Sequence, residues 1–209
     1  YIGETPEVRD LFVATGFNSV GIAASGGVGK VVADWIRDRR PPMDLADVDV
    51  RRVMPFQANK RYLRDRTTET LGLLYAMHWP YYQYASARGA RRTPLHDRLL
   101  VAGACMGETA GWERPNWYST PGATPRYDYS YGRQNWFDAC REECLAVRDA
   151  VALFDQTCFA KFIVQGRDAC AVLNRLSTSN VDVPPGRIVY TQWLNDRAGI
   201  EADLTITRL

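Results

Sequence analysis

The segment Tyr190-Thr-Gln-Trp-Leu-Asn-Asp-Arg-Ala-Gly-Ile-Glu-Ala-Asp-Leu-Thr-Ile-Thr-Arg-Leu209 carries the clearest structural signal in this chain. Two runs rich in β-branched and aromatic residues flank Asn195–Gly199, whose Asn, Asp and Gly residues tolerate positive φ angles, so the pattern predicts a β-hairpin. In the second strand Asp203 falls on the polar face, opposite an apolar face of alternating residues. Two interpretations stay open for Asp203: a solvated outer face, or a carboxylate on a rigid strand directed into a polar cavity.

The hairpin contains the pattern Tyr-x-x-x-Leu-Asn-x-x-x-Gly-Ile-x-x-Asp-Leu-Thr-Ile. This pattern resembles the folate-binding segment of the glycine-cleavage T-protein (aminomethyltransferase) family, especially its form in sarcosine and dimethylglycine dehydrogenases. There the Asp of the second strand faces the reactive nitrogens of tetrahydrofolate. The resemblance implies that Asp203 is catalytic and that Tyr190 lines the folate. Ala198 and Ala202 depart from the pattern, since relatives often carry Gly and a second acidic or polar residue there.

The composition is that of an ordinary soluble globular protein, with 46% hydrophobic and 24% charged residues among 209. The net charge of +2 is too small to indicate nucleic acid or an anionic membrane as a partner. The five cysteines include no CxxC pair and the chain has only two histidines, so no metal site is predicted. Reduced cysteines indicate bacterial cytoplasm or the mitochondrial matrix.

The order of predicted elements indicates an α+β fold in three regions, residues 1–39, 40–126 and 127–209. The Pro/Gly-rich connection Ser119–Pro125 marks the second boundary. Helices are predicted at Asn59–Met77, from about Pro94 to before Gly103, and at Asp138–Asp149 with Asp138 as cap. A strand is predicted at Phe159–Gln165, and Gly166–Asp168 leads from it into a helix that ends near Leu176. The third region ends within a sheet, so we expect that domain to be incomplete.

A glycine-rich stretch, Ala24-Ser-Gly-Gly-Val-Gly29, lies between a predicted strand at Leu11–Thr15 and a predicted helix at Lys30–Ile36. It is not a Walker A loop, because Val31 occupies the position where that motif needs Ser or Thr. It is not a Rossmann fingerprint, because Val32 occupies the position of the third Gly. It is either a tight strand-to-helix turn or a helix N-terminus whose unpaired N–H groups and positive dipole face a reduced flavin.

A longer pattern supports the second interpretation: Gly16-Phe-Asn-Ser-Val-Gly-Ile22, then Gly26-Gly-Val-Gly-Lys30, then Ala33-Asp-Trp-Ile36. It resembles the last FAD-contacting segment of D-amino-acid-oxidase-like flavoproteins, most closely the sarcosine/dimethylglycine dehydrogenase branch. The resemblance implies that Gly26, Gly27, Val28 and Gly29 contact the flavin. It also implies that residues 1–39 end an FAD domain, that 40–126 form a middle linking domain, and that 127–209 begin a folate-binding domain.

Together the two resemblances imply a central fragment of a two-site enzyme, inactive by itself. FAD would oxidise the N-methyl group of sarcosine, dimethylglycine or a related amine, and tetrahydrofolate would capture the one-carbon unit. Oxygen and an electron-transfer flavoprotein stay open as electron acceptors. The alternative is a non-catalytic regulatory protein similar to the regulatory subunit of pyruvate dehydrogenase phosphatase, which shares this three-part layout.

An aromatic cluster, Trp79-Pro-Tyr-Tyr-Gln-Tyr84, follows His78 in the middle region. Such a cluster lines an amine pocket through cation–π contacts, or it packs between neighbouring segments. The sequence leaves both interpretations open.

Overall fold

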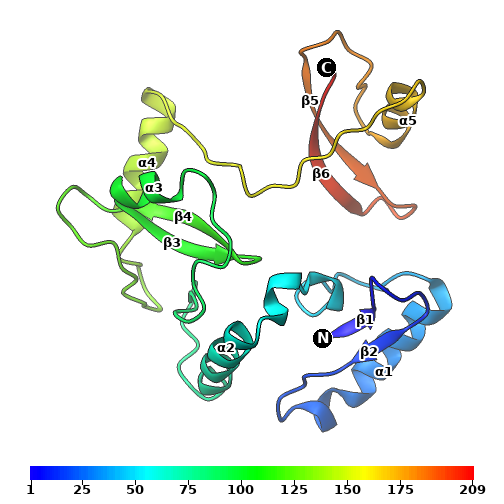
Figure 1. The fold of residues 1–209 in the computed structure, drawn as a ribbon, viewed down its shortest axis with the longest axis horizontal. Helices are drawn as coiled ribbons and strands as arrows, with labels where there is room; N and C mark the ends of the chain where they lie inside the picture. Colours follow the sequence, from blue (N-terminus) through cyan, green and yellow to red (C-terminus); the bar gives the residue numbers. More distant parts are fainter. The chain divides into compact units, whose positions relative to one another are not determined.

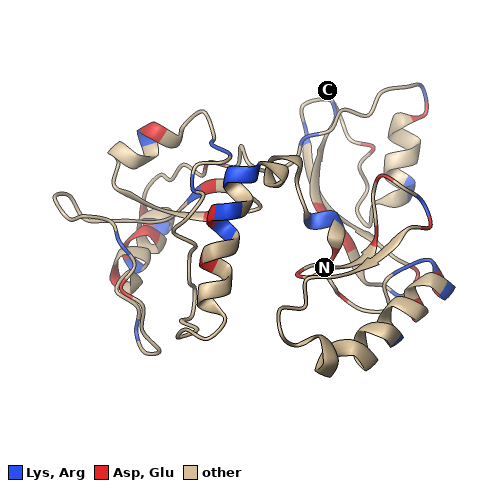
Figure 2. Cartoon of the chain, turned by 60° about the horizontal axis from the view of Figure 1, so that its bottom comes forward, with Lys and Arg blue, Asp and Glu red and all other residues tan.

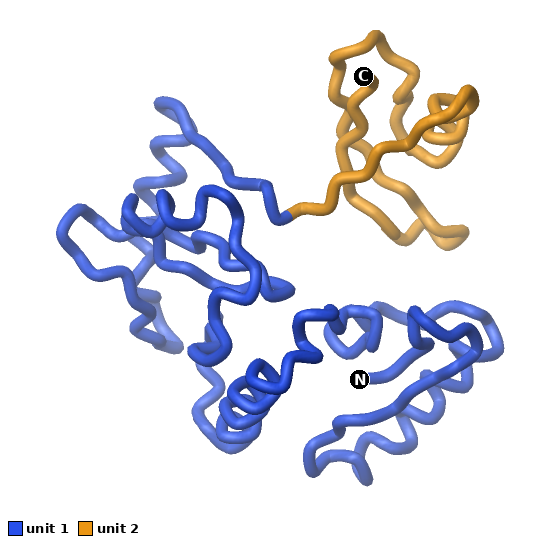
Figure 3. Tube along the Cα trace, viewed as in Figure 1, with its two compact units in different colours: residues 1–158 blue, residues 159–209 orange.

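The computed structural model describes residues 1–209 and divides them into two compact units, residues 1–158 and 159–209 (Figure 3). Both units combine helices with two-stranded antiparallel sheets. This composition confirms the mixed α/β character predicted from the sequence.

The first unit starts with strands β1 (Ile2–Glu4) and β2 (Phe12–Ala14), which pair antiparallel, and helix α1 (Gly21–Asp38) lies beside β1 (Figure 1). Trp35 of α1 is 2% exposed and meets the Phe12 ring edge-on, with 6.1 Å between ring centroids. Gly3 allows this packing, because its φ is +118° and a β-carbon there would lie 2.6 Å from the Trp35 ring.

Short 3-10 helices η1 (Val50–Arg52) and η2 (Pro55–Ala58) lead into helix α2 (Lys60–Leu73). Asn59 caps α2, since its side-chain oxygen accepts hydrogen bonds from the backbone N–H groups of Arg61 and Tyr62. The predicted helix extended to Met77, but α2 ends at Leu73. The His78 ring nitrogen bonds to the Leu73 carbonyl, which satisfies one of the terminal acceptors of the helix.

Helix α3 (His96–Val101) precedes a hairpin of β3 (Ala104–Thr109) and β4 (Trp112–Tyr118), and helix α4 (Phe137–Asp149) packs on β4. A Glu143 carboxylate oxygen accepts the Tyr118 backbone N–H at 2.7 Å and so ties α4 to the strand. The prediction of Asp138 as cap is wrong. Asp138 lies in the first helical turn and makes an ion pair with Arg133 at 2.5 Å.

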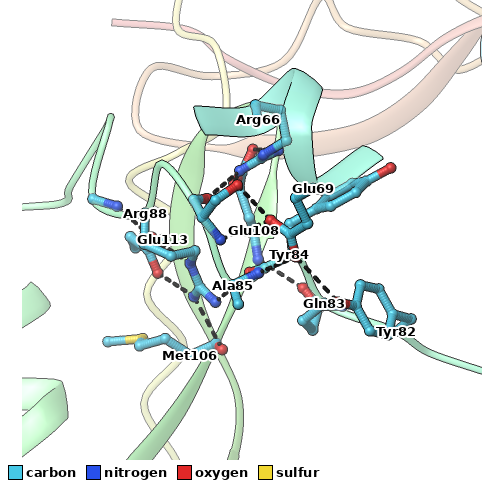
Figure 4. A network of polar contacts seen from close by, with 12 residues as sticks. Arg66, Glu69, Tyr82, Gln83, Tyr84, Ala85, Arg88, Met106, Glu108 and Glu113 are labelled. Atoms are coloured by element: carbon cyan, nitrogen blue, oxygen red, sulfur yellow. Dashed lines mark hydrogen bonds and ion pairs between the residues drawn. The ribbon is translucent and has the colours of Figure 1, made fainter. Parts of the chain in front are cut away.

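A polar network joins α2, the loop after it and the β3–β4 hairpin (Figure 4). Arg66 pairs with Glu108 at 2.5 Å, and both side chains are nearly buried. Glu69 accepts hydrogen bonds from the backbone N–H of Ala85 and from the Tyr82 hydroxyl. Hydrogen bonds thus hold the irregular segment between α2 and α3 in place without regular secondary structure.

The second unit contains α5 (Ala169–Leu176) and the hairpin of β5 (Ile188–Leu194) and β6 (Ile200–Thr207), which confirms the predicted hairpin. The strand predicted at Phe159–Gln165 is wrong. That segment forms no sheet ladder, since β5 and β6 pair with each other and, through one isolated bridge at Trp193, with Ser177. Its apolar residues Phe162 and Ile163 are 87% and 77% exposed.

Lys, Arg, Asp and Glu residues are interspersed along most elements in Figure 2, and basic residues are most closely spaced in the first half of α2. None of the helices combines the length and hydrophobicity needed to span a membrane.

Candidate functional site

The outward face of the β5–β6 hairpin brings together the two residues predicted to bind folate. Gln192 lies directly across from Asp203 and donates a hydrogen bond to its carboxylate at 3.1 Å. A hydrogen bond to Asp203 also raises the pKa of Tyr190 above its usual range. Tyr190 and Asp203, from different strands, therefore form one contact cluster with Gln192.

The opposite face of the hairpin is held by hydrogen bonds to the segment that follows α5, and this attachment determines which residues point outward. Thr191 is fully buried, and its hydroxyl oxygen accepts the backbone N–H of Ser179 at 3.1 Å. The indole N–H of Trp193 donates to the Ser177 hydroxyl at 3.0 Å. Sequence reasoning did not single out Thr191 and Trp193; their alternation with Tyr190 and Gln192 is the signal that identifies them.

The hairpin loop fixes the register on which this cluster depends. The Asn195 side-chain oxygen accepts hydrogen bonds from the N–H groups of Arg197 and Gly199, both at 2.9 Å. Ala198 takes the left-handed conformation with φ of +61°. A register slip of one residue would move Asp203 to the opposite face, so these loop contacts are part of the site.

The chemistry of this face suits a planar heterocycle that carries N–H donors. A carboxylate offers about four acceptor positions, and Gln192 and Tyr190 together occupy two of them on Asp203. Tyr190 and Ile188, on the same face, are 62% and 66% exposed and supply apolar surface for contact with a ring. The donors, acceptors and apolar surface present therefore fit tetrahydrofolate.

The glycine-rich stretch does not have the predicted geometry. Helix α1 already begins at Gly21, so the predictions of a loop at residues 24–29 and of a helix that starts at Lys30 are wrong. Packing of Trp35 and the Lys30–Asp34 ion pair at 2.6 Å support the helix despite its glycines. The four residues predicted to contact the flavin, Gly26, Gly27, Val28 and Gly29, all lie in the helix interior.

The position of Gly26–Gly29 inside α1 determines whether their backbone N–H groups can contact a flavin. Interior helical N–H groups bond to carbonyls four residues earlier, so those of Gly26–Gly29 cannot cradle a negatively charged ring. The Ala24 N–H bonds to the Val20 carbonyl, which leaves the N–H groups of residues 21–23 at the helix end. The expected mode of flavin contact therefore does not fit these glycines.

The helical placement makes a testable prediction for stability. Gly26, Gly27 and Gly29 are exposed, and a β-carbon at each would meet no atom within 4 Å. Because glycine destabilises a helix interior by roughly 0.5–1 kcal/mol relative to alanine, we expect the triple Gly→Ala variant to be about 2 kcal/mol more stable. Urea unfolding followed by circular dichroism measures this difference. A less stable variant would contradict the helix and favour a loop with positive φ angles.

Comparison with known proteins identifies relatives over the whole chain. It is 54% identical over 208 residues to 4-methylaminobutanoate oxidase (formaldehyde-forming) of Paenarthrobacter nicotinovorans, and 37% identical over 233 residues to human mitochondrial sarcosine dehydrogenase. It is 33% identical over 213 residues to the mouse mitochondrial pyruvate dehydrogenase phosphatase regulatory subunit. Each match covers 100% of this chain, which spans about a quarter of the length of these curated relatives.

Two family models match adjacent parts of the chain. Residues 40–93 match the FAD dependent oxidoreductase central domain, and residues 95–209 match the GCVT N-terminal domain. The second match begins before residue 127, where the sequence places the start of that domain, and the domain boundaries stay a prediction. The matches confirm the resemblance carried by the two motifs and support FAD and tetrahydrofolate as cofactors. The chain belongs to the GCVT N-terminal domain family over residues 95–209, joined to an FAD dependent oxidoreductase central domain over residues 40–93.

Proposed function

We propose that this chain is the central part of an enzyme that oxidises an N-methylated amino acid with FAD and transfers the one-carbon unit to tetrahydrofolate. The order of the two matched domains supports the pairing of an oxidation site with a transfer site. The observation that carries the proposal is the placement of Tyr190 and Asp203 on one exposed face of the hairpin, where Gln192 donates a hydrogen bond to the Asp203 carboxylate. Neighbouring carboxylate and phenol groups on a rigid strand pair are suited to hold a nitrogen heterocycle.

Asp203 has the central role in the proposed transfer step. A carboxylate favours the cationic form of a neighbouring amine and accepts its hydrogen bonds. Gln192 keeps the carboxylate directed along the outward face through its hydrogen bond at 3.1 Å. Tyr190 would contact the ring of the folate beside that carboxylate. FAD would supply the oxidation of the N-methyl carbon, and tetrahydrofolate would carry the product as 5,10-methylenetetrahydrofolate.

The substrate we propose is a small amino acid of the sarcosine or dimethylglycine type, and the names of the relatives extend this class to 4-methylaminobutanoate. In all three molecules, an N-methylated amine is attached to the aliphatic chain of a carboxylic acid. An electron-transfer flavoprotein or oxygen would take up the electrons. Bacterial cytoplasm and the mitochondrial matrix both fit relatives of bacterial and mitochondrial origin.

The regulatory alternative rests on one relative, the pyruvate dehydrogenase phosphatase regulatory subunit at 33% identity. It requires no oxidation of a small amine. Reduction of the flavin in the full-length protein by sarcosine, dimethylglycine or 4-methylaminobutanoate separates the two functions. Failure of all three amines to reduce the flavin would favour the regulatory function.

The transfer role is tested by Asp203→Asn in the full-length protein. We expect formation of 5,10-methylenetetrahydrofolate to fall roughly 10²-fold, as for loss of a group that assists proton transfer, while the amine reduces the flavin at the original rate. The control is Glu201→Gln, on the same strand face, whose carboxylate accepts the Asn195 amide at 2.6 Å. Equal product formation by Asp203→Asn and Glu201→Gln would contradict the role of Asp203.

A further inference from the structure

The first unit contains a second candidate site, a pocket of about 210 Å³. Its lining residues are distant in sequence from the β5–β6 hairpin. It is lined by four aromatic and two amide side chains: Tyr81, Gln83, Asn116, Trp117, Tyr127 and Trp136. The volume is several times the roughly 30 Å³ of one liquid water and below the roughly 300–1,000 Å³ of pockets for drug-sized ligands. It therefore suits a small organic group.

The aromatic rings of the pocket meet almost at right angles. Tyr81 and Trp136 lie 5.8 Å apart between centroids with planes at 87°, and Tyr127 and Trp136 lie 5.3 Å apart at 80°. Trp117 and Tyr127 continue the arrangement at 6.4 Å and 84°. These edge-to-face contacts gather the four rings around one pocket, here called the aromatic box, where one compact group can contact several of them.

The floor of the pocket is polar but uncharged. The Asn116 amide N–H donates to the Tyr127 hydroxyl at 2.9 Å, and the Gln83 side-chain oxygen accepts the Glu108 backbone N–H at 2.9 Å. Gly107 leaves room for both amides, since a β-carbon there would lie 2.8 Å from the Gln83 oxygen. This close approach explains why a residue without a side chain occupies that position in β3.

The neutral aromatic rings of the lining favour a cationic guest over an anionic one. No charged side chain of either sign lines the pocket, so no Lys or Arg repels a cation there, and nearby Arg88 is paired with Glu113 at 2.5 Å. Tyr127 is a neutral phenol at physiological pH, as tyrosine ordinarily is, and burial raises its pKa further. The faces of neutral aromatic rings carry partial negative charge, which attracts cations and repels anions.

We propose that this aromatic box binds a small methylated ammonium group. Methyl groups on nitrogen spread the positive charge over an apolar surface that perpendicular rings can enclose, and this is the chemistry of aromatic cages. Tyr81 forms the accessible wall, since it is 70% exposed whereas Trp117 is 6% exposed. The site shares no residue with the Tyr190–Asp203 cluster, so it stands without the proposed folate function.

The test uses choline and 3,3-dimethyl-1-butanol, which have nearly the same shape but differ in charge. Choline titrated into the full-length protein is expected to bind saturably, with its N-methyl proton resonance shifted upfield by the ring currents of the box. The neutral alcohol is expected to bind at least about 5-fold more weakly, within the usual range of cation–π energies. Equal binding of the two probes, or no saturable shift with choline, would overturn the proposal.

Variants of Tyr81, the exposed residue of the box, distinguish choline binding in the box from binding elsewhere on the surface. Tyr81→Leu is expected to weaken choline binding about 5-fold, whereas Tyr81→Phe keeps the ring and stays within about 2-fold of the original. Tyr75→Leu is the matched control, because Tyr75 is 86% exposed and lies outside the pocket lining. Circular dichroism verifies that each variant folds. A Tyr75→Leu effect as large as that of Tyr81→Leu would contradict binding in the box.

Discussion

Replacing Glu113 by glutamine is expected to lower the free energy of unfolding by about 3 kcal/mol, the range for breaking a buried ion pair. The Glu113 side chain is 4% exposed and accepts two hydrogen bonds from Arg88, at 2.8 and 2.5 Å. It also accepts the Gly89 backbone N–H at 2.6 Å. Glutamine keeps the size of the side chain but leaves the guanidinium without its counter-charge. Because Arg88 is 29% exposed, water recovers part of the loss.

The same contacts give the stability a defined dependence on pH. Burial alone would raise the pKa of Glu113, but the hydrogen bonds from Arg88 and Gly89 and the Arg88 charge lower it below its usual range. A carboxyl whose pKa is lower in the folded state stabilises the fold above its unfolded pKa, about 4.3. This contribution is lost as the pH falls from there through the folded pKa. Glu113→Gln is expected to flatten that part of the acid-unfolding profile.

A matched control separates a buried ion pair from an exposed one. Arg141 and Glu142 also approach to 2.5 Å, but their side chains are 58% and 68% exposed. Glu142→Gln is expected to cost less than about 1 kcal/mol, as for other surface ion pairs. Denaturant unfolding at pH 7 compares the two variants. Similar losses in both would contradict the view that burial makes the Arg88–Glu113 pair important.

The hairpin could be predicted from sequence because its signals are local. Alternation of residue types and the loop Asn195–Gly199 determine both the strands and the face that holds Tyr190 and Asp203. The cap at Asn59 is equally local, since its side chain bonds to the next residues of the helix. Such features depend on neighbouring residues and not on the rest of the fold.

The failures have non-local causes. Glycines indicate a loop when taken alone, yet α1 continues through Gly26–Gly29 because packing of Trp35 stabilises the helix. The segment Phe159–Gln165 has the composition of a strand, but a strand also needs a pairing partner. The aromatic box joins residues up to 55 positions apart, Tyr81 and Trp136, by contacts that no sequence period reveals.

Gly111 is the other position where a single substitution is expected to have a large effect. It lies in the turn between β3 and β4 with φ of +78°, and its carbonyl accepts the Arg91 backbone N–H at 3.0 Å. A β-carbon there would overlap the Phe56 ring, with 2.7 Å to Cε1. Phe56 in turn meets Tyr62 of α2 edge-on, at 5.2 Å between centroids. The turn thus joins the hairpin to the segment that leads into α2.

Gly111→Ala is expected to lower the free energy of unfolding by about 3 kcal/mol, because left-handed strain costs roughly 1–2 kcal/mol and steric overlap adds roughly 1–3 kcal/mol. Gly122→Ala is the matched control, since Gly122 has φ of +86° but a β-carbon there would meet nothing within 4 Å. That variant should lose only the strain contribution. Denaturant unfolding measures both, and equal losses would show that the Phe56 contact contributes nothing to the requirement for glycine at position 111.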